Sequence, residues 1–76
     1  MEVKIQLFGQ IKQIAGAAEL TTDAADTDEL IKEMNTRYPS LENLPYLIAV
    51  NRNIIQANTP ITAGEELALL PPYSGG

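Results

Sequence analysis

The sequence predicts an α+β roll, in which one sheet is covered by one main helix. The chain has 76 residues, of which 45% are hydrophobic, so it can build one small core and no second one. Its apolar patterns follow the order ββαβββ, with only one segment long enough for a main helix. A single helix can cover one face of one sheet, which argues against a doubly wound fold and against an all-β fold.

The first strand is predicted over residues 2–8, where apolar and polar side chains alternate as in a half-buried strand. The apolar residues of this pattern are Val3, Ile5 and Leu7. Phe8 then falls on the polar face. A short helical turn is predicted over residues 10–15, between two glycines, and a brief strand follows over residues 18–22.

The main helix is predicted over residues 27–38. Asp26 and Glu29 form a capping box, in which the Asp26 carboxylate accepts from the backbone near Glu29 while Glu29 reaches back. Pro39 ends the helix because it disfavours the α conformation in the residue before it. The apolar side chains expected to face the sheet are Leu30, Ile31 and Met34.

The second half of the chain supplies the other strands. In order, we predict a loop over residues 39–45, a strand over 46–50, a turn over 51–53, a weak strand over 54–55 and a last strand over 66–70. Pro71 and Pro72 end the last strand because neither can donate a hydrogen bond to a neighbour. The chain therefore divides into a domain over residues 1–70 and an extended C-terminal tail over residues 71–76.

Composition restricts the chemistry that the chain can perform by itself. Cysteine and histidine are absent, which excludes thiolate catalysis, zinc–thiolate sites and the commonest general base, and we expect no metal site. The net charge is −5 and the five basic residues are scattered, which argues against nucleic-acid binding. No apolar run approaches the roughly 20 residues that span a bilayer, and the first residues do not resemble a signal peptide. We predict a cytoplasmic protein that contacts no membrane.

The C-terminal residues carry the main chemical signal. Gly75 and Gly76 lack side chains, so they can enter a tunnel too narrow for any other residue and bring the terminal carboxylate to a buried reaction centre. Pro71 and Pro72 hold the base of the tail near polyproline geometry and lower the entropy cost of threading it. A carboxylate is anionic at neutral pH and a poor electrophile, so another enzyme must activate it. A glycine pair is also compatible with a frayed chain end.

Three stretches of the chain resemble a known family. They are residues 7–16, with the sequence LFGQIKQIAG, residues 49–51, with the sequence AVN, and residues 60–76, in which a Gly-Glu-Glu turn precedes the last strand and the ending PPYSGG. The whole chain is similar to the molybdopterin synthase small subunit (MoaD) family. The related thiamine carriers usually lack the double proline, and the basic tail that precedes the glycines of ubiquitin is absent here.

The resemblance implies a β-grasp, ubiquitin-like fold with a mixed sheet and a flexible diglycine tail. It also implies a sulfur carrier that binds no cofactor and has no catalytic residues of its own. A ubiquitin-activating-like adenylyltransferase would use ATP to adenylate the carboxylate of Gly76, and a sulfur source would convert it to a thiocarboxylate. The tail would then thread into the large subunit of molybdopterin synthase and give sulfur to a cyclic pyranopterin precursor, in molybdenum cofactor biosynthesis. The residues that would thread are Pro71, Pro72, Tyr73, Ser74 and Gly75.

Three apolar residues, Phe8, Ile54 and Tyr73, match positions at which the family contacts its large subunit. We therefore predict that they form a docking surface with the last strand, while the acidic excess steers the domain toward a partner with a basic rim. Three other functions stay open: a sulfur carrier of the thiamine pathway, a ubiquitin-like modifier joined to lysines through Gly76, and a non-catalytic scaffold whose tail has no role. The identity of the partner would separate these hypotheses.

Overall fold

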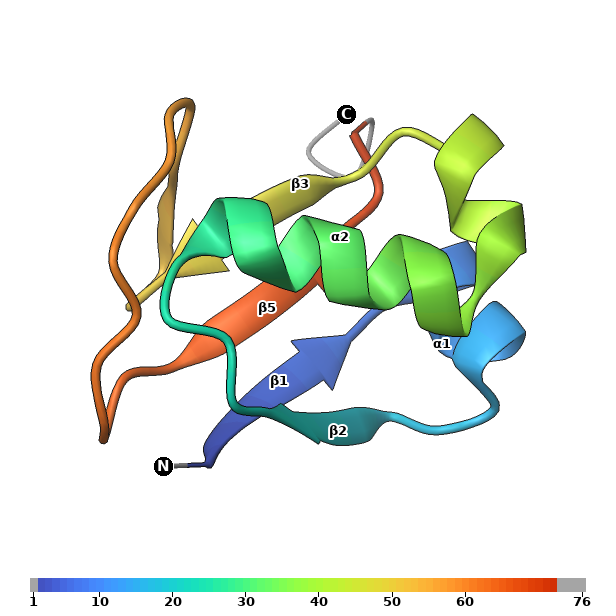
Figure 1. Ribbon diagram of the computed structural model, residues 1–76. Helices are drawn as coiled ribbons and strands as arrows, with labels where there is room; N and C mark the ends of the chain where they lie inside the picture. The colour runs from blue at the N-terminus through green and yellow to red at the C-terminus, as the bar shows by residue number, and fades with distance from the viewer. Residues whose placement is uncertain (1, 73–76) are drawn as a thin grey trace.

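The computed structural model describes residues 2–72 and shows one helix lying across one face of a five-stranded sheet (Figure 1). The strands are β1 (Val3–Leu7), β2 (Glu19–Thr22), β3 (Leu47–Val50), β4 (Asn53–Ile54) and β5 (Leu67–Leu70). The helices are α1 (Gly9–Ala15), the main helix α2 (Thr27–Arg37) and the 3₁₀ helix η1 (Pro39–Asn43). The predicted order of strands and main helix is confirmed, whereas the predicted loop over residues 39–45 is wrong, because most of it forms η1.

The sheet is mixed, with its strands in the order β2-β1-β5-β3-β4. The central strands β1 and β5 are parallel, in a register that pairs Ile5 with Leu67 and Leu7 with Leu69. The other neighbouring strands are antiparallel. The first and last strands of the chain therefore lie side by side in the middle of the sheet, so both lead out of it at the same edge.

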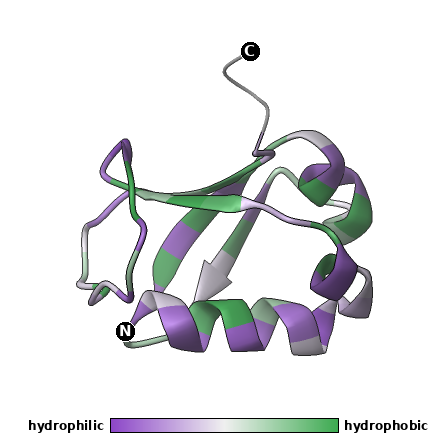
Figure 2. Cartoon of the chain, turned by 90° about the horizontal axis from the view of Figure 1, so that it is seen from above, coloured by the Kyte–Doolittle hydropathy of each residue, from purple (hydrophilic) through white to green (hydrophobic). Residues whose placement is uncertain are grey.

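The inner face of the sheet, which α2 covers, forms the core. Leu30 and Met34 are one turn apart on α2 and are 0% and 1% exposed, so the predicted burial of Met34 is confirmed. The strand residues buried with them include Val3, Ile5, Leu7, Ile48, Val50, Leu67 and Leu69. The predicted burial of Ile31 is wrong, because successive helical residues are about 100° apart and Ile31, next to Leu30, is 36% exposed. Apolar and hydrophilic bands accordingly alternate along α2 (Figure 2).

Side chains at both ends of α2 explain where it begins and ends. The Asp26 carboxylate accepts a hydrogen bond from the Glu29 backbone N–H at 2.9 Å, as predicted. The returning Glu29 carboxylate accepts from Ala25 N–H at 3.3 Å, one residue before the position of a standard capping box. The helix stops at Arg37, one residue earlier than predicted, because Tyr38 before the proline leaves the helical conformation.

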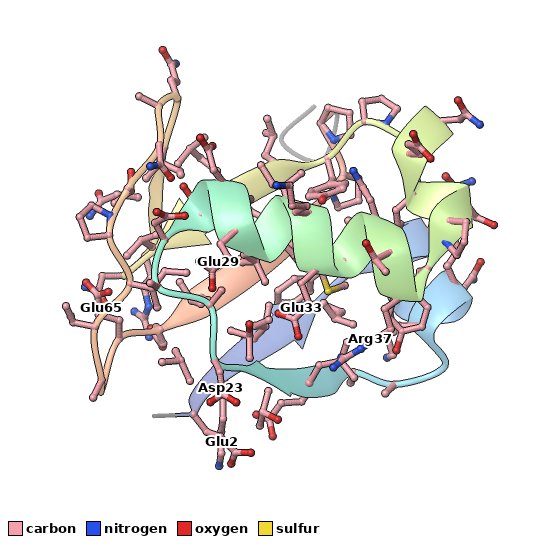
Figure 3. All side chains as sticks on the ribbon, viewed as in Figure 1. Glu2, Asp23, Glu29, Glu33, Arg37 and Glu65 are labelled. Atoms are coloured by element: carbon pink, nitrogen blue, oxygen red, sulfur yellow. The ribbon has the colours of Figure 1, made fainter. Side chains whose placement is uncertain are left out.

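Helix α2 is also joined to the edge strand β2 by side chains. The Thr22 hydroxyl donates to the Glu33 carboxylate, and Arg37 pairs with the same carboxylate at 3.4 Å. Figure 3 shows Glu33 and Arg37 on the side of α2 that faces β2.

Among residues 2–72, no helix is long and apolar enough to cross a membrane.

A two-residue turn joins β3 to β4. Asn51 and Arg52 have positive φ values of 52° and 69°, as in the type I′ turns that suit the twist of a hairpin. The turn is one residue shorter than predicted, so β4 spans Asn53–Ile54 rather than residues 54–55. Asn51 is also tied to the chain before β5, because its side-chain oxygen accepts from Glu66 N–H at 3.0 Å and its own N–H donates to the Glu66 carbonyl at 2.7 Å.

Candidate functional site: the outer face of the sheet

The outer face of the sheet, opposite α2, carries a shallow open groove of about 370 Å³. Four strands contribute to it, because alternate residues of each strand point away from the core. The main lining residues are Gln6, Phe8, Ala49, Ile54, Ala68 and Leu70. This groove is a surface on which another macromolecule can lie rather than an enclosed site for a small molecule.

Small side chains form the floor of the groove. The strand register places Gln6, Ala68, Ala49 and Ile54 in one row across β1, β5, β3 and β4. Two alanines at the centre of this row leave the middle of the face low. Larger side chains stand on either side of them, so the face is concave where a flat sheet would be level.

Phe8 and Ile54 are the exposed apolar side chains of the groove. They are 42% and 47% exposed, against 0% for Ile5 on the inner face. Phe8 directly follows β1, and Ile54 lies on the edge strand β4, so the two residues border the groove from different strands. The structure therefore brings together two of the three residues predicted to form a docking surface. The third, Tyr73, lies outside the described residues.

The groove has charged residues at its border. Arg52 and Glu66 form an ion pair at 3.3 Å, with side chains 87% and 54% exposed, so water weakens their attraction. A neighbouring concavity beside the start of β1 is lined by four glutamates, Glu2, Glu19, Glu65 and Glu66, and by one cation, Lys4. Glu2 and Glu65 are labelled in Figure 3. This excess of carboxylates favours a partner with a basic rim.

The base of the tail is fixed at the edge of the same sheet. Phe8 N–H donates to the Leu69 carbonyl at 3.2 Å, which continues the parallel pairing beyond the end of β1. Pro71 is partly buried and Pro72 is exposed. The predicted functional residues Ser74, Gly75 and Gly76 lie outside the described residues, so their roles stay predictions.

The sequence prediction placed the last strand in the docking surface but named none of the residues that form the floor of the groove. The alternation that places Phe8 opposite Leu7 also places Ala68 and Leu70 opposite Leu67 and Leu69, so strand parity could have found both. Ala49 could not be found in this way, because Tyr46 to Val50 is a continuous apolar run that has no polar face. Its place on the outer face follows only from the register between β3 and β5.

The described side chain with a raised pKa, Tyr46, does not line the groove. Burial raises the pKa of Tyr46, which lines a separate concavity beside α2 together with Ile31 and Ile55. Within residues 2–72, no group of three or more histidine, cysteine, aspartate or glutamate side chains is arranged to hold a metal ion.

Comparisons with known proteins agree with this fold. The model of the ThiS family matches residues 5–76. The molybdopterin synthase sulfur carrier subunit of Escherichia coli (strain K12) is 30% identical, over 97% of this chain and 99% of that protein. A protein–protein complex of subunits 1 and 2 of the molybdopterin-converting factor from Helicobacter pylori contains a chain 34% identical over the full length of both, with a TM-score of 0.72. The small archaeal modifier protein 1 of Methanosarcina acetivorans is 25% identical, with a TM-score of 0.82 over 99% of this chain and 96% of that chain. These likenesses and the sheet topology confirm the β-grasp fold.

Proposed function

This chain belongs to the ThiS family, and on that premise we propose that it is the sulfur carrier subunit of a molybdopterin synthase. The observation that carries the proposal is its full-length similarity, at about 30% identity, to curated proteins with that name. The similarity to a chain from a complex of two molybdopterin-converting subunits supports a large subunit as the main partner. A cytoplasmic location, with these partners, is part of the proposal.

The reactive group of the proposal is the carboxylate of Gly76. An adenylyltransferase joins it to AMP at the expense of ATP, which replaces a poor leaving group by a good one. Sulfide-level sulfur from a donor then displaces AMP and leaves a thiocarboxylate. When this sulfur passes to a cyclic pyranopterin precursor, water restores the carboxylate of Gly76. On this proposal the chain itself holds no cofactor, since ATP is bound by the activating enzyme, and its lack of histidine and cysteine is no obstacle.

The docking surface of the proposal is the outer groove. Phe8 and Ile54 meet the large subunit there together with Tyr73, while the tail continues into the active site of that subunit. Six extended residues, 71–76, span roughly 20 Å, which is enough to reach a buried centre from a domain docked outside. Pro71 and Pro72 direct the tail, and Tyr73, Ser74 and Gly75 occupy its path.

A second candidate function is that of a protein modifier. It is favoured by the likeness to the small archaeal modifier protein 1, which is 25% identical over nearly the whole chain. In that case Gly76 would form an isopeptide bond with a lysine of another protein. A carrier of the thiamine pathway is the remaining alternative and would require a thiazole synthase as partner.

The test follows sulfur from Gly76 to its acceptor. The full chain is incubated with the activating enzyme, ATP and a sulfur donor, its intact mass is measured, and it is then mixed with the large subunit and the pyranopterin precursor. We expect the mass gain of sulfur replacing oxygen, and conversion to molybdopterin.

A variant that lacks Gly76 is the matched control. We expect it to fold as the wild type does and to support no conversion, because its new end stops about 3.3 Å short and a misplacement of even ~1 Å can cost about a hundredfold in rate. Conversion by this variant, or a wild type that never gains sulfur, would show that the carrier proposal is wrong. Lysine adducts formed instead would favour the modifier.

A further inference from the structure

The parallel pairing of β1 and β5 brings a glycine next to the base of the tail. Because Leu7 pairs with Leu69 in parallel, the residues that follow each strand continue side by side. Phe8 N–H donates to the Leu69 carbonyl at 3.2 Å. Two residues beyond the pair Leu7 and Leu69, the same register places Gly9 beside Pro71. The chain therefore leaves the sheet toward the tail against the corner between β1 and α1.

Gly9 is in contact with Pro71 in a way that no other residue type permits. A Cβ atom at Gly9 would lie 2.6 Å from Cγ of the Pro71 ring, and 3.5 Å and 3.8 Å from its Cδ and Cβ. Ordinary carbon–carbon contacts are at about 3.5–4.0 Å, so the ring would have to move by about 1 Å. The ring is closed onto the backbone nitrogen of Pro71, so Cγ can give way only by a change of ring pucker or by a movement of the main chain at the start of the tail.

Two other glycines, Gly16 and Gly64, also have a positive φ but make no such contact. Gly9, Gly16 and Gly64 all have positive φ values, of 60°, 74° and 86°. A side chain at any of them is strained for that reason alone. A Cβ atom at Gly16 or Gly64, however, would meet nothing within 4 Å. Of these three described glycines, only Gly9 has a neighbour in the space where a side chain would be.

We propose that Gly9 is a positioning residue for the C-terminal tail: its missing side chain leaves the seat for the Pro71 ring that sets the direction in which the tail leaves the domain. The inference rests on the proposed function, since direction matters only if the end of the tail must reach a reaction centre. Gly9 acts through Pro71 and touches neither sulfur nor precursor. Its effect is therefore on the rate of transfer from a docked carrier.

The test compares Gly9→Ala with Gly16→Ala, since both substitutions impose the same kind of backbone strain and only the first closes the seat. Sulfur-loaded carriers are titrated against the large subunit, and the maximal conversion rate and the half-saturating carrier concentration are measured. For Gly9→Ala we expect a maximal rate tenfold to a hundredfold below that of Gly16→Ala, because the displacement is about 1 Å. The half-saturating concentration should differ by less than about twofold, as the groove is unchanged.

A second variant isolates the contact itself. Pro71→Ala removes Cγ and Cδ and keeps the Cβ atom that lies 3.8 Å from the substituted position. In that background, adding Gly9→Ala should lower the rate no more than adding Gly16→Ala does. If Gly9→Ala alone fails to fold, recovery of the fold in the double variant supports the seat, and failure to recover contradicts it.

Nuclear Overhauser contacts between the Gly9 α protons and the Pro71 ring give a readout independent of activity. They should be present in the wild type and in Gly16→Ala. Their absence from the wild type, or equal rates for Gly9→Ala and Gly16→Ala, would overturn the inference about Gly9. A wild type that shows these contacts and transfers no sulfur would instead overturn the proposed function and leave the seat intact.

Discussion

The two faces of the sheet differ in what their side chains do. On the inner face, Ile5 and Leu69 are fully buried against α2, whose Leu30 is also 0% exposed, and this packing holds the domain together. On the outer face, Phe8 and Ile54 keep 42% and 47% of their surface exposed, over a floor of two alanines. The same strands supply both faces by simple alternation. If the outer face docks a partner as proposed, stability and partner binding can therefore be changed almost independently by substitutions one residue apart along a strand.

The largest expected effect is on the inner face. Met34→Ala should lower the free energy of unfolding by about 2–5 kcal/mol, because the side chain is 1% exposed and its removal leaves a cavity beneath α2. Urea unfolding followed by circular dichroism measures the loss. At temperatures where the variant is folded, its affinity for the large subunit should match that of the wild type. A loss below about 1 kcal/mol would show that the core is not centred on this helix.

On the outer face we expect a substitution to change the affinity for the partner and to leave stability nearly unchanged. Phe8→Ala should weaken docking to the large subunit by about 2 kcal/mol, roughly thirtyfold in Kd, while the free energy of unfolding changes by less than about 1 kcal/mol. Calorimetric titration and urea unfolding of the same sample measure the two quantities. Ile54→Ala is the companion variant at the other border of the groove. Unchanged binding in both variants would place the docking surface elsewhere.

A smaller effect on stability is expected in the turn between β3 and β4, which borders the groove and lies outside the core. Arg52 has a φ of 69°, which glycine adopts more easily, so Arg52→Gly should raise the free energy of unfolding by about 0.5–1 kcal/mol. The lost ion pair with Glu66 offsets little of this, since both side chains are more than half exposed. Asn53→Gly, one residue later within β4, should instead be destabilising. Thermal unfolding distinguishes the two signs.

The smallest effect concerns Tyr46, beside α2. Its hydroxyl oxygen is buried and has no hydrogen-bond partner among the described residues, so Tyr46→Phe should raise stability at pH 7 by about 0.5 kcal/mol or less. Burial raises the pKa of Tyr46, so the unfolded chain releases this proton first as the pH increases. The wild type should therefore lose stability above about pH 10, and the advantage of Tyr46→Phe should grow there. An advantage that shrinks with pH would contradict the burial of this hydroxyl.

Much of the fold could be predicted because local signals and the global fold agree. The alternation over residues 2–8, the cap at Asp26 and the stop at Pro39 each act within a few residues, and each placed its element to within one or two residues. The capping contact of Asp26 is present in the structure. The burial of Ile31 was mispredicted because apolar spacing alone does not say which edge of a helical stripe faces the sheet.

The candidate site could be predicted only in part, for a related reason. Phe8 was found because its place in a strand pattern conflicts with its chemistry. The concave floor at Ala49 and Ala68 depends on the register of strands about twenty residues apart in sequence, to which composition and periodicity give no access. The contact of Gly9 with Pro71 depends on the parallel pairing of the first and last strands, which no local pattern encodes.

The central position of β5 also determines how the domain responds to a mechanical force. A pull on the tail acts along the axis of β5, which is hydrogen-bonded on both sides, to β1 and to β3. The force therefore shears all the bonds of both ladders together instead of opening them one at a time from an end. If a partner holds the tail as in the proposed function, a pull on it therefore loads both ladders in shear and does not open the sheet from one end.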